Sequence, residues 1–102
     1  MAEIKWTLQA ANDLESIAEF IAKDSPQSAG MFVGDLFQAT ERIALYPKSG
    51  RMVPEVGNPA IREVILGSYR LVYRLKKDCV ELLTVFHGSR LFDPSAWKSG
   101  GP

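Results

Sequence analysis

Four side chains in the second half of the sequence are of types that together could cleave RNA without a metal ion. They are Arg62, Arg70, His87 and Arg90. A histidine exchanges a proton near neutral pH and can act as general base or acid towards a ribose hydroxyl. Arginines can stabilise the charge that develops on the attacked phosphate. The competing interpretation is that His87 hydrogen-bonds locally and orders the turn at Gly88, and the lack of a second acid–base group favours it.

A second group of cations follows the pattern of a strand over residues 69–76. One face of this strand would carry the apolar positions Tyr69, Leu71, Tyr73 and Leu75, which belong against a hydrophobic layer. The other face would carry Arg70, Val72, Arg74 and Lys76. Cations on that face would stand about 7 Å apart, a spacing that suits successive phosphates or an acidic peptide. The candidate contacts for a binding partner are therefore Arg70, Arg74, Lys76 and Arg90, and the alternative is a solvated sheet face.

The sequence offers little for metal or cofactor chemistry. It contains one cysteine, Cys79, and one histidine, so neither a metal site nor a cofactor is expected. A lone thiol cannot build a disulfide framework, which indicates a reducing cytoplasm. No signal peptide is visible, and no stretch approaches the roughly 20 apolar residues of a membrane span. We therefore expect a cytoplasmic protein without a membrane partner.

The net charge is zero over 102 residues, but the charges are unevenly distributed. Residues 1–40 hold six acidic and two basic residues, a net charge of −4, whereas residues 41–102 hold ten basic and six acidic residues, a net charge of +4. This asymmetry suggests a basic working surface in the second half. The alternative is two oppositely charged surfaces without a function.

The first half of the sequence predicts a short strand followed by two helices. Residues 4–6 alternate like a strand, and Thr7 can then cap a helix that runs to Asp24 with apolar residues at helical spacing. Ser25 and Pro26 are typical of a second helix start, and Tyr46-Pro47 ends that helix. The short link predicts an antiparallel helical hairpin.

The second half predicts a loop over residues 48–60 and then three strands. The strands cover residues 61–66, 69–76 and 80–87, separated by turns at Gly67-Ser68 and Lys77-Asp78, and they form an antiparallel meander. The fold class is therefore α+β, in the order β-α-α-β-β-β, with the helical hairpin packed on a small, mostly antiparallel sheet. Residues 1–98 form one domain, and residues 99–102 a frayed tail.

Several segments together resemble the RelE/ParE superfamily of toxins. The resemblance covers roughly residues 4–92, and no single motif in it is specific, but the ordered combination is. The segments are Ile4–Thr7, Ala11, Asp13-Leu14, Ile17, Ile21-Ala22, Tyr46-Pro47, Gly50-Arg51, Arg62-Glu63, Tyr69–Arg74 and Val85–Arg90. The resemblance implies the fold described above. It also implies the toxin of a type II toxin–antitoxin module, held by a cognate antitoxin that orders on binding and that itself contacts DNA.

The superfamily has two working classes, and the resemblance implies one of two targets. RelE-like members cleave mRNA in the ribosome with basic residues, to which Arg62, Arg70 and Arg90 would correspond, and His87 would take the place of a late tyrosine. This sequence has Val64 where a second basic residue is expected, and residues 93–97 contain no tyrosine. These departures favour the ParE-like class, which poisons DNA gyrase without being an enzyme. A third alternative is an inactive interaction module of the same fold.

Overall fold

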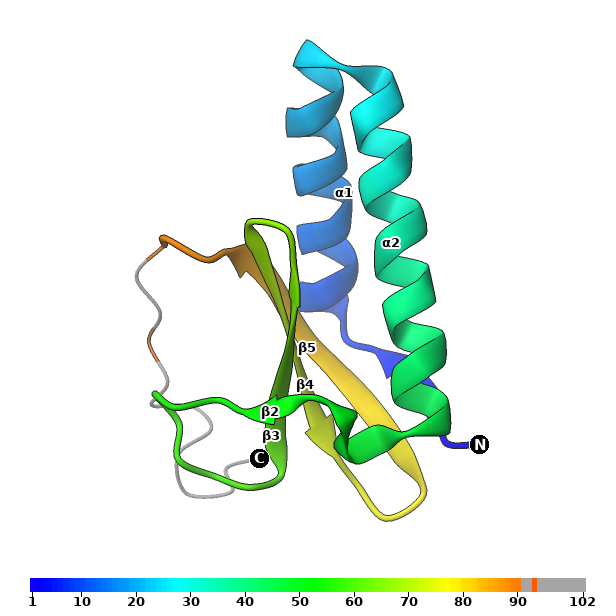
Figure 1. Cartoon of the computed structure of the whole chain (residues 1–102), viewed down its shortest axis with the longest axis vertical. Helices are drawn as coiled ribbons and strands as arrows, with labels where there is room; N and C mark the ends of the chain where they lie inside the picture. The colour runs from blue at the N-terminus through cyan, green and yellow to red at the C-terminus, as the bar shows by residue number, and fades with distance from the viewer. Residues whose placement is uncertain (91–92, 94–102) are drawn as a thin grey trace.

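The structure, a computed structural model, describes residues 1–90 and residue 93. Its helices are α1 (Leu8–Asp24) and α2 (Pro26–Leu45), followed by one 3-10 turn, η1 (Pro47–Ser49). Its strands are β1 (Glu3–Trp6), β2 (Arg51–Met52), β3 (Ile61–Leu66), β4 (Tyr69–Leu75) and β5 (Cys79–His87). The predicted α+β class and element order are confirmed, and β2 is an additional short strand inside the predicted loop. The two helices lie side by side and extend past one end of the sheet (Figure 1).

Both helices begin after the cap residues that the sequence predicts, Thr7 and Ser25. The Thr7 hydroxyl accepts a hydrogen bond from the Ala10 amide at 3.1 Å and donates one to the Leu82 carbonyl at 2.7 Å. The Ser25 hydroxyl accepts from the Ser28 amide at 3.0 Å. Each cap satisfies an amide that the first helical turn leaves without a partner. The Thr7 cap also ties the start of α1 to the middle of β5.

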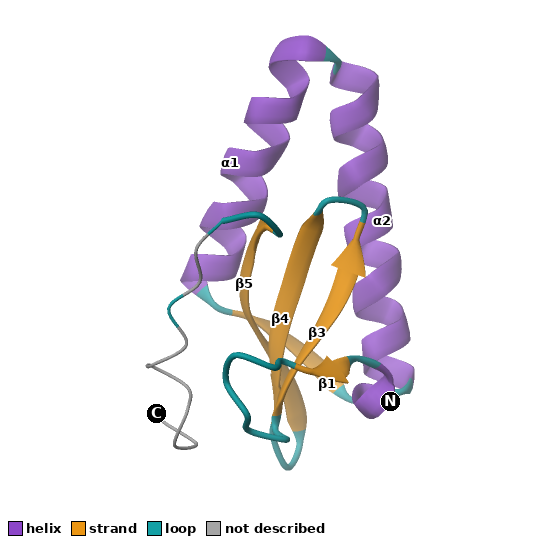
Figure 2. Cartoon of the chain, turned by 60° about the vertical axis from the view of Figure 1, so that its left-hand side comes forward, coloured by secondary structure: helices purple, strands orange, loops and turns teal. Residues whose placement is uncertain are grey.

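The five strands form one sheet in the order β1-β5-β4-β3-β2. All neighbours are antiparallel except β1, which pairs parallel with β5, so the first described strand lies beside the last described one. Figure 2 shows the helices on one side of this sheet. The hydrophobic core between the two layers includes Ala10, Phe32, Leu36 and Ile43 from the helices and Leu71, Tyr73, Val80, Leu82 and Val85 from the sheet. We call this side of the sheet the helix face and the other side the distal face.

A bulge in β5 changes the faces that its side chains occupy. Val72 of β4 pairs with Thr84, whereas the next residue, Tyr73, pairs with Leu82, so β5 carries one extra residue. Leu82 therefore lies on the helix face and Phe86 on the distal face. Strict alternation would place Val80, Leu82, Thr84 and Phe86 on one face, but alternation of this kind holds only in a strand without a bulge.

Asp13 on α1 holds the bulge. Its carboxylate accepts a hydrogen bond from the Thr84 hydroxyl and another from the Val85 amide, the latter at 3.1 Å. A bulge disturbs the ladder and leaves backbone groups that need other partners. One helical side chain therefore fixes the place at which β5 changes face.

The distal face has a smaller hydrophobic cluster of its own. Residues Val53 and Val56, in the segment between β2 and β3, pack there against Ile61, Val72, Leu83 and Phe86. The Tyr73 hydroxyl fixes the start of this segment, since it donates to the Pro47 carbonyl at 2.7 Å and accepts from the Gly50 amide at 2.9 Å. Burial raises the pKa of the Tyr73 hydroxyl. The predicted loop is therefore an ordered layer that covers part of the sheet.

Two further predictions concern the C-terminal tail and the absence of a membrane span. The predicted frayed tail, residues 99–102, and the part of the predicted domain after Asp93 lie outside the described residues. Neither described helix combines the length and the apolar character that crossing a membrane requires.

Candidate functional site

The centre of the distal face is a pair of arginines interleaved with a pair of glutamates. Arg70 donates from Nε to Glu63 at 2.6 Å and from its two terminal nitrogens to the two carboxylate oxygens of Glu55 at 2.8 and 2.9 Å. Its guanidinium carbon lies 5.2 Å from the centre of the Phe86 ring. Such forked, charge-assisted bonds and a stacked ring hold a guanidinium in one orientation. The pKa of Arg70 is raised, first by the bond to Glu55.

Glu63 is the buried member of this group. Its side chain has no exposed surface, and it also accepts a bond from Arg51 Nε at 2.6 Å. We call Arg51, Glu55, Glu63 and Arg70 the arginine–glutamate cluster. Its formal charges sum to zero, so the buried carboxylate and both guanidinium groups are compensated.

The position of the β4 arginines confirms one prediction and corrects another. Arg70 and Arg74 lie on the distal face, turned away from the helices, as the alternation of β4 predicts. The prediction that they present an exposed row of cations is wrong, because each residue is only 9% exposed. The segment that carries Val53 and Glu55 packs over this face and supplies both apolar cover and counter-charge.

The four predicted partner contacts do not form a continuous stripe. Lys76 is exposed at the end of β4 and lies 3.7 Å from Glu81, while Arg74 lies 3.8 Å from the same carboxylate. Arg90 is exposed beyond the end of β5. Because β4 and β5 are antiparallel, Lys76 and Arg90 lie at opposite ends of the sheet.

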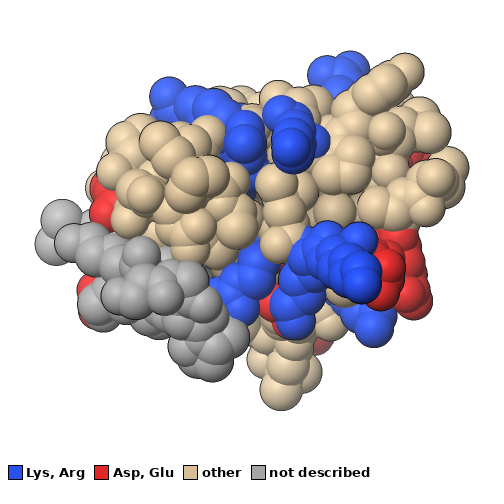
Figure 3. Space-filling model, turned by 90° about the horizontal axis from the view of Figure 1, so that it is seen from below, with Lys and Arg blue, Asp and Glu red and all other residues tan. Residues whose placement is uncertain are grey.

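Several exposed lysine and arginine side chains lie at the lower end of the molecule as drawn in Figure 1, in separate groups. Figure 3 views this end, where Lys and Arg side chains form separate groups with Asp and Glu side chains beside them. The segments at this end in Figure 1 include η1 and the turn between β4 and β5, which carry the exposed Lys48, Lys76 and Lys77. The predicted excess of positive charge in the second half is therefore divided between an internal, neutral cluster and dispersed surface groups.

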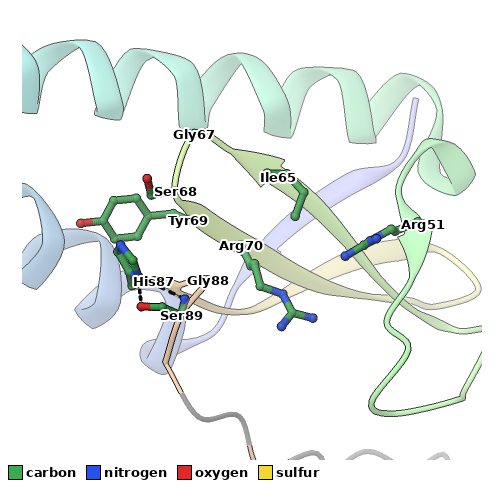
Figure 4. Close-up of a pocket in the computed structure, with 9 residues that line it drawn as sticks. All are labelled: Arg51, Ile65, Gly67, Ser68, Tyr69, Arg70, His87, Gly88 and Ser89. Atoms are coloured by element: carbon green, nitrogen blue, oxygen red, sulfur yellow. Dashed lines mark hydrogen bonds between the residues drawn. The ribbon is translucent and has the colours of Figure 1, made fainter.

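A hollow of about 420 Å³ lies beside the arginine–glutamate cluster. Its lining comes from β2, β3, β4, β5 and the turns that follow β3 and β5: Arg51, Ile65, Gly67, Ser68, Tyr69, Arg70, His87, Gly88 and Ser89. Figure 4 shows the Arg70 guanidinium directed away from the His87 ring, which lies against Tyr69. The hollow therefore brings Arg70 and His87 to one site without directing them at a common point.

His87 makes the local contacts expected of a residue that orders a turn. Its Nδ1 accepts from the Ser89 amide at 3.2 Å and lies 2.7 Å from the Ser89 hydroxyl. Its ring meets the Tyr69 ring edge-on, with 5.3 Å between the centres. The bulge in β5 accounts for this position, because it places His87 on the same face as Tyr69.

The other two candidate ribonuclease residues lie apart from Arg70. Arg62 lies on the helix face of β3, since it pairs with Tyr73 of that face. Its side chain donates to the backbone carbonyls of Pro59 at 3.0 Å and Gly50 at 3.2 Å. Arg90 is exposed, and its backbone amide donates to the His87 carbonyl at 3.0 Å. The structure therefore brings Arg70 and His87 together at one hollow. Arg90 is close to His87 through a backbone hydrogen bond, whereas Arg62 lies on the opposite face of the sheet.

Sequence reasoning missed the two acidic members of the cluster, Glu55 and Glu63. A signal for Glu63 is present, since it shares the distal face of β3 with Ile61 and Ile65, where an apolar residue would be usual. A charge at such a position requires a partner, and the next strand carries Arg70. Glu55 gives no such signal, because it lies in a segment without regular structure.

Within residues 1–90 and 93, no group of three or more His, Cys, Asp or Glu side chains is placed to hold a metal ion. The free thiol of Cys79 is partly buried at the start of β5. The chemistry available at the hollow is therefore that of guanidinium groups, one imidazole and hydroxyl groups.

The ion pair between Arg70 and the partly exposed Glu55 predicts that the stability of the protein depends on pH. The hydrogen bonds from Arg70 lower the pKa of Glu55 from 4.5 to about 2. A depressed pKa in the folded state contributes stability above pH 4.5, and this contribution is lost as the pH falls towards 2. Since the Glu55 side chain is 40% exposed, we expect about 1 kcal/mol or less.

The measurement is urea unfolding of the protein and of Glu55→Gln between neutral pH and pH 2. The two free energies of unfolding should differ at neutral pH and converge in acid. A difference that stays constant over this range would contradict the ion pair.

Comparison with known proteins identifies the fold and the family. The model of the family described as "ParE toxin of type II toxin-antitoxin system, parDE" matches residues 4–92. Y4kP of Sinorhizobium fredii is 39% identical over 87 residues, which cover 82% of this chain and 85% of that protein. Toxin RelE2 of Caulobacter vibrioides is 30% identical over 92 residues, 89% of this chain and 100% of that protein.

A solved structure has the same fold. It is titled "Chromosomal ParDE TA system from P. aeruginosa", and it superposes with a TM-score of 0.69 at 23% identity, covering 85% of this chain and 96% of the solved one. The match of the family model over most of the chain and the identity to Y4kP agree with the resemblance seen in the sequence. This chain belongs to the ParE toxin family of type II toxin–antitoxin systems.

Proposed function

We propose that this chain is the toxin of a two-protein module, that its cognate antitoxin neutralises it, and that it inhibits growth by binding DNA gyrase rather than by cleaving RNA. Membership of the ParE family supports the module and the antitoxin. The solved relative is titled as a ParDE system, which agrees with such a partner. Any contact of this chain with DNA is then indirect, through the antitoxin.

The observation that carries the choice of target is the neutralised state of Arg70. All three nitrogens of its guanidinium are engaged by Glu55 and Glu63. A ribonuclease needs a cation that is free to stabilise the charge of the attacked phosphate. In this chain the cation at the centre of the distal face stabilises carboxylates instead.

The dispersion of the other candidates supports the same choice. His87 is bonded to Ser89, and Arg62 is bonded to backbone carbonyls on the opposite face. General acid–base catalysis requires groups that converge on one reacting atom. A ribosome-dependent endoribonuclease is the alternative function, favoured by the presence of Arg70 and His87 in one hollow and by the name of the relative RelE2.

The experiment compares the two targets with one preparation of protein. Purified toxin is added to a DNA gyrase supercoiling and cleavage assay and, separately, to a translating extract that contains a defined transcript. We expect gyrase-dependent DNA breaks and an intact transcript, and we expect the antitoxin to suppress the breaks. Unaffected gyrase together with a cleaved transcript would establish the alternative instead.

The variant His87→Ala provides a matched test of the same choice. The His87 side chain does not belong to the hydrophobic core and is exposed, so the fold should persist. The gyrase effect should therefore equal that of the unchanged protein, measured as the toxin concentration that halves supercoiling. Loss of growth inhibition in this folded variant would favour the ribonuclease. Absence of growth inhibition by the unchanged chain would favour an inactive interaction module.

A further inference from the structure

Two cations beside η1 carry charges that no described carboxylate compensates. The arginines of the arginine–glutamate cluster are bonded to carboxylates, and Lys76 lies 3.7 Å from Glu81. Lys48 and Arg62 differ, because among the described residues no acidic side chain forms an ion pair with either. The side-chain hydrogen bonds of Arg62 go to two backbone carbonyls, which leave its charge in place. Uncancelled positive charge therefore lies around η1.

Apolar side chains are exposed in the same place. Leu45 ends α2 and is 54% exposed, Tyr46 follows it and is 66% exposed, and Met52 of β2 is 44% exposed. Met52 is paired with Arg62, so these two side chains lie on the same face of the sheet. Tyrosine, methionine and arginine are residue types that protein–protein interfaces favour. We call Leu45, Tyr46, Lys48, Met52 and Arg62 the η1 surface.

The buried Tyr73 holds the η1 surface in shape. Its hydroxyl bonds to the Pro47 carbonyl at the start of η1 and to the Gly50 amide just after it. The Tyr46 carbonyl accepts from the Ser49 amide at 2.9 Å, which closes the turn. A surface that is ordered before it binds loses less entropy on association. Such order suits the working surface of a toxin, which must be ready as soon as the antitoxin is gone.

The distribution of charge defines the chemistry of the partner. Residues 44–54 contain two basic residues and no acidic one. Glu55, the next acidic residue, is bonded to Arg70. A surface of one sign attracts a surface of the opposite sign and raises the rate of association. The partner that fits is therefore an acidic protein surface with an apolar depression for the Tyr46 ring.

We propose that the η1 surface is the part of this chain that contacts DNA gyrase, through an acidic patch of that target. This inference rests on the proposed function and names the contact surface and the chemistry of its partner. A nucleic acid fits this surface less well, because the chain has no net charge and the two cations would neutralise few phosphates. A protein target engages both the cations and the exposed apolar side chains.

Charge reversal at Lys48 tests the electrostatic part of the proposal. Lys48→Glu should slow association with purified gyrase about tenfold at low salt, and added salt should reduce the difference because it screens exposed charges. Lys77→Glu is the matched control, since Lys77 is also exposed but is followed by Asp78. It changes the net charge by the same amount and should alter the rate by less than about twofold. Surface plasmon resonance measures both rates.

Truncation of Tyr46 tests the apolar part. Tyr46→Ala should weaken gyrase binding by about tenfold or more, as truncation of an interface anchor does. Phe20→Ala is the control, because Phe20 is 67% exposed but lies near the C-terminal end of α1, at the other end of the helical hairpin. It should bind gyrase like the unchanged protein. Circular dichroism should show that all four variants keep the fold.

The outcomes separate this inference from the proposed function. Folded Lys48→Glu and Tyr46→Ala proteins that bind gyrase as tightly as their controls would overturn the inference and leave the proposed function intact. Absence of gyrase binding by the unchanged protein would overturn both. An association rate of the unchanged protein that does not depend on salt would contradict the role of charge without any variant.

Two further results would give the η1 surface to a different partner and so overturn the inference. One is loss of antitoxin binding in Lys48→Glu together with unchanged gyrase binding. The other is binding of a short DNA duplex by the unchanged toxin, in the absence of gyrase, that Lys48→Glu abolishes. We expect neither result, so antitoxin affinity should be the same in Lys48→Glu and Lys77→Glu.

Discussion

Glu63→Ala should lower the free energy of unfolding by about 3–5 kcal/mol, the loss typical of breaking a buried charge pair on one side. The Glu63 carboxylate is fully buried between Arg51 and Arg70, with both hydrogen bonds at 2.6 Å. Its removal leaves the 9% exposed Arg70 with one counter-charge instead of two and opens a cavity in the distal layer. Urea unfolding monitored by tryptophan fluorescence measures the loss.

Glu55→Ala is the control, because Glu55 binds the same arginine from the solvent side. Its side chain is 40% exposed, so water can replace it at the terminal nitrogens of Arg70. We expect a loss of about 1 kcal/mol or less. Equal losses in the two variants would show that burial does not decide the contribution of each carboxylate.

Gly50→Ala should destabilise the protein by about 1–3 kcal/mol, the usual cost of overpacking an interior. A Cβ at position 50 would lie 2.5 Å from the Tyr73 hydroxyl oxygen and 2.7 Å from the Glu63 carbonyl oxygen. The second of these atoms belongs to backbone inside the sheet and cannot move without disturbing β3. The Gly50 backbone has φ −74°, which other residues also adopt, so the effect is one of space and not of backbone conformation.

Gly34→Ala tests the same chemical change where space is open. Gly34 lies within α2, and a Cβ there would meet nothing within 4 Å. Alanine favours the helix over glycine by up to about 1 kcal/mol, so this variant should be more stable than the unchanged protein. Opposite signs in the two melting-temperature shifts are the expected result. A stabilising Gly50→Ala would mean that the segment after η1 does not pack against Tyr73.

Glu63 and Gly50 meet at one place, where the segment after α2 joins the outer strand. Arg51, next to Gly50, pairs with Glu63 both through the strand register and through its side chain. Tyr73 bonds to Gly50 and Pro47 from the adjacent strand. The distal face therefore depends on a few polar contacts at the start of its covering segment, which explains why both variants are expected to have large effects.

The sequence by itself determined both helices and four of the five described strands, but not β2. The caps at Thr7 and Ser25 and the strand bounds 61–66 could be located because they depend on local rules of hydrogen bonding and side-chain periodicity. The same local rules placed Arg70 and Arg74 on the face turned away from the helices. The family resemblance followed from the order of these segments and is confirmed by the family model.

Tertiary structure alone decided what surrounds those side chains. Arg70 is a neutralised, buried group and not an exposed cation because Glu55, fifteen residues earlier, packs over it. His87 lies against Tyr69 because a single extra residue in β5 moves the following side chains to the opposite faces of the sheet. No local sequence pattern predicts that extra residue. The physical reason is the same in both cases. Local propensity acts over a few residues, whereas counter-charges, bulges and strand neighbours are set by contacts between segments that lie far apart in the chain.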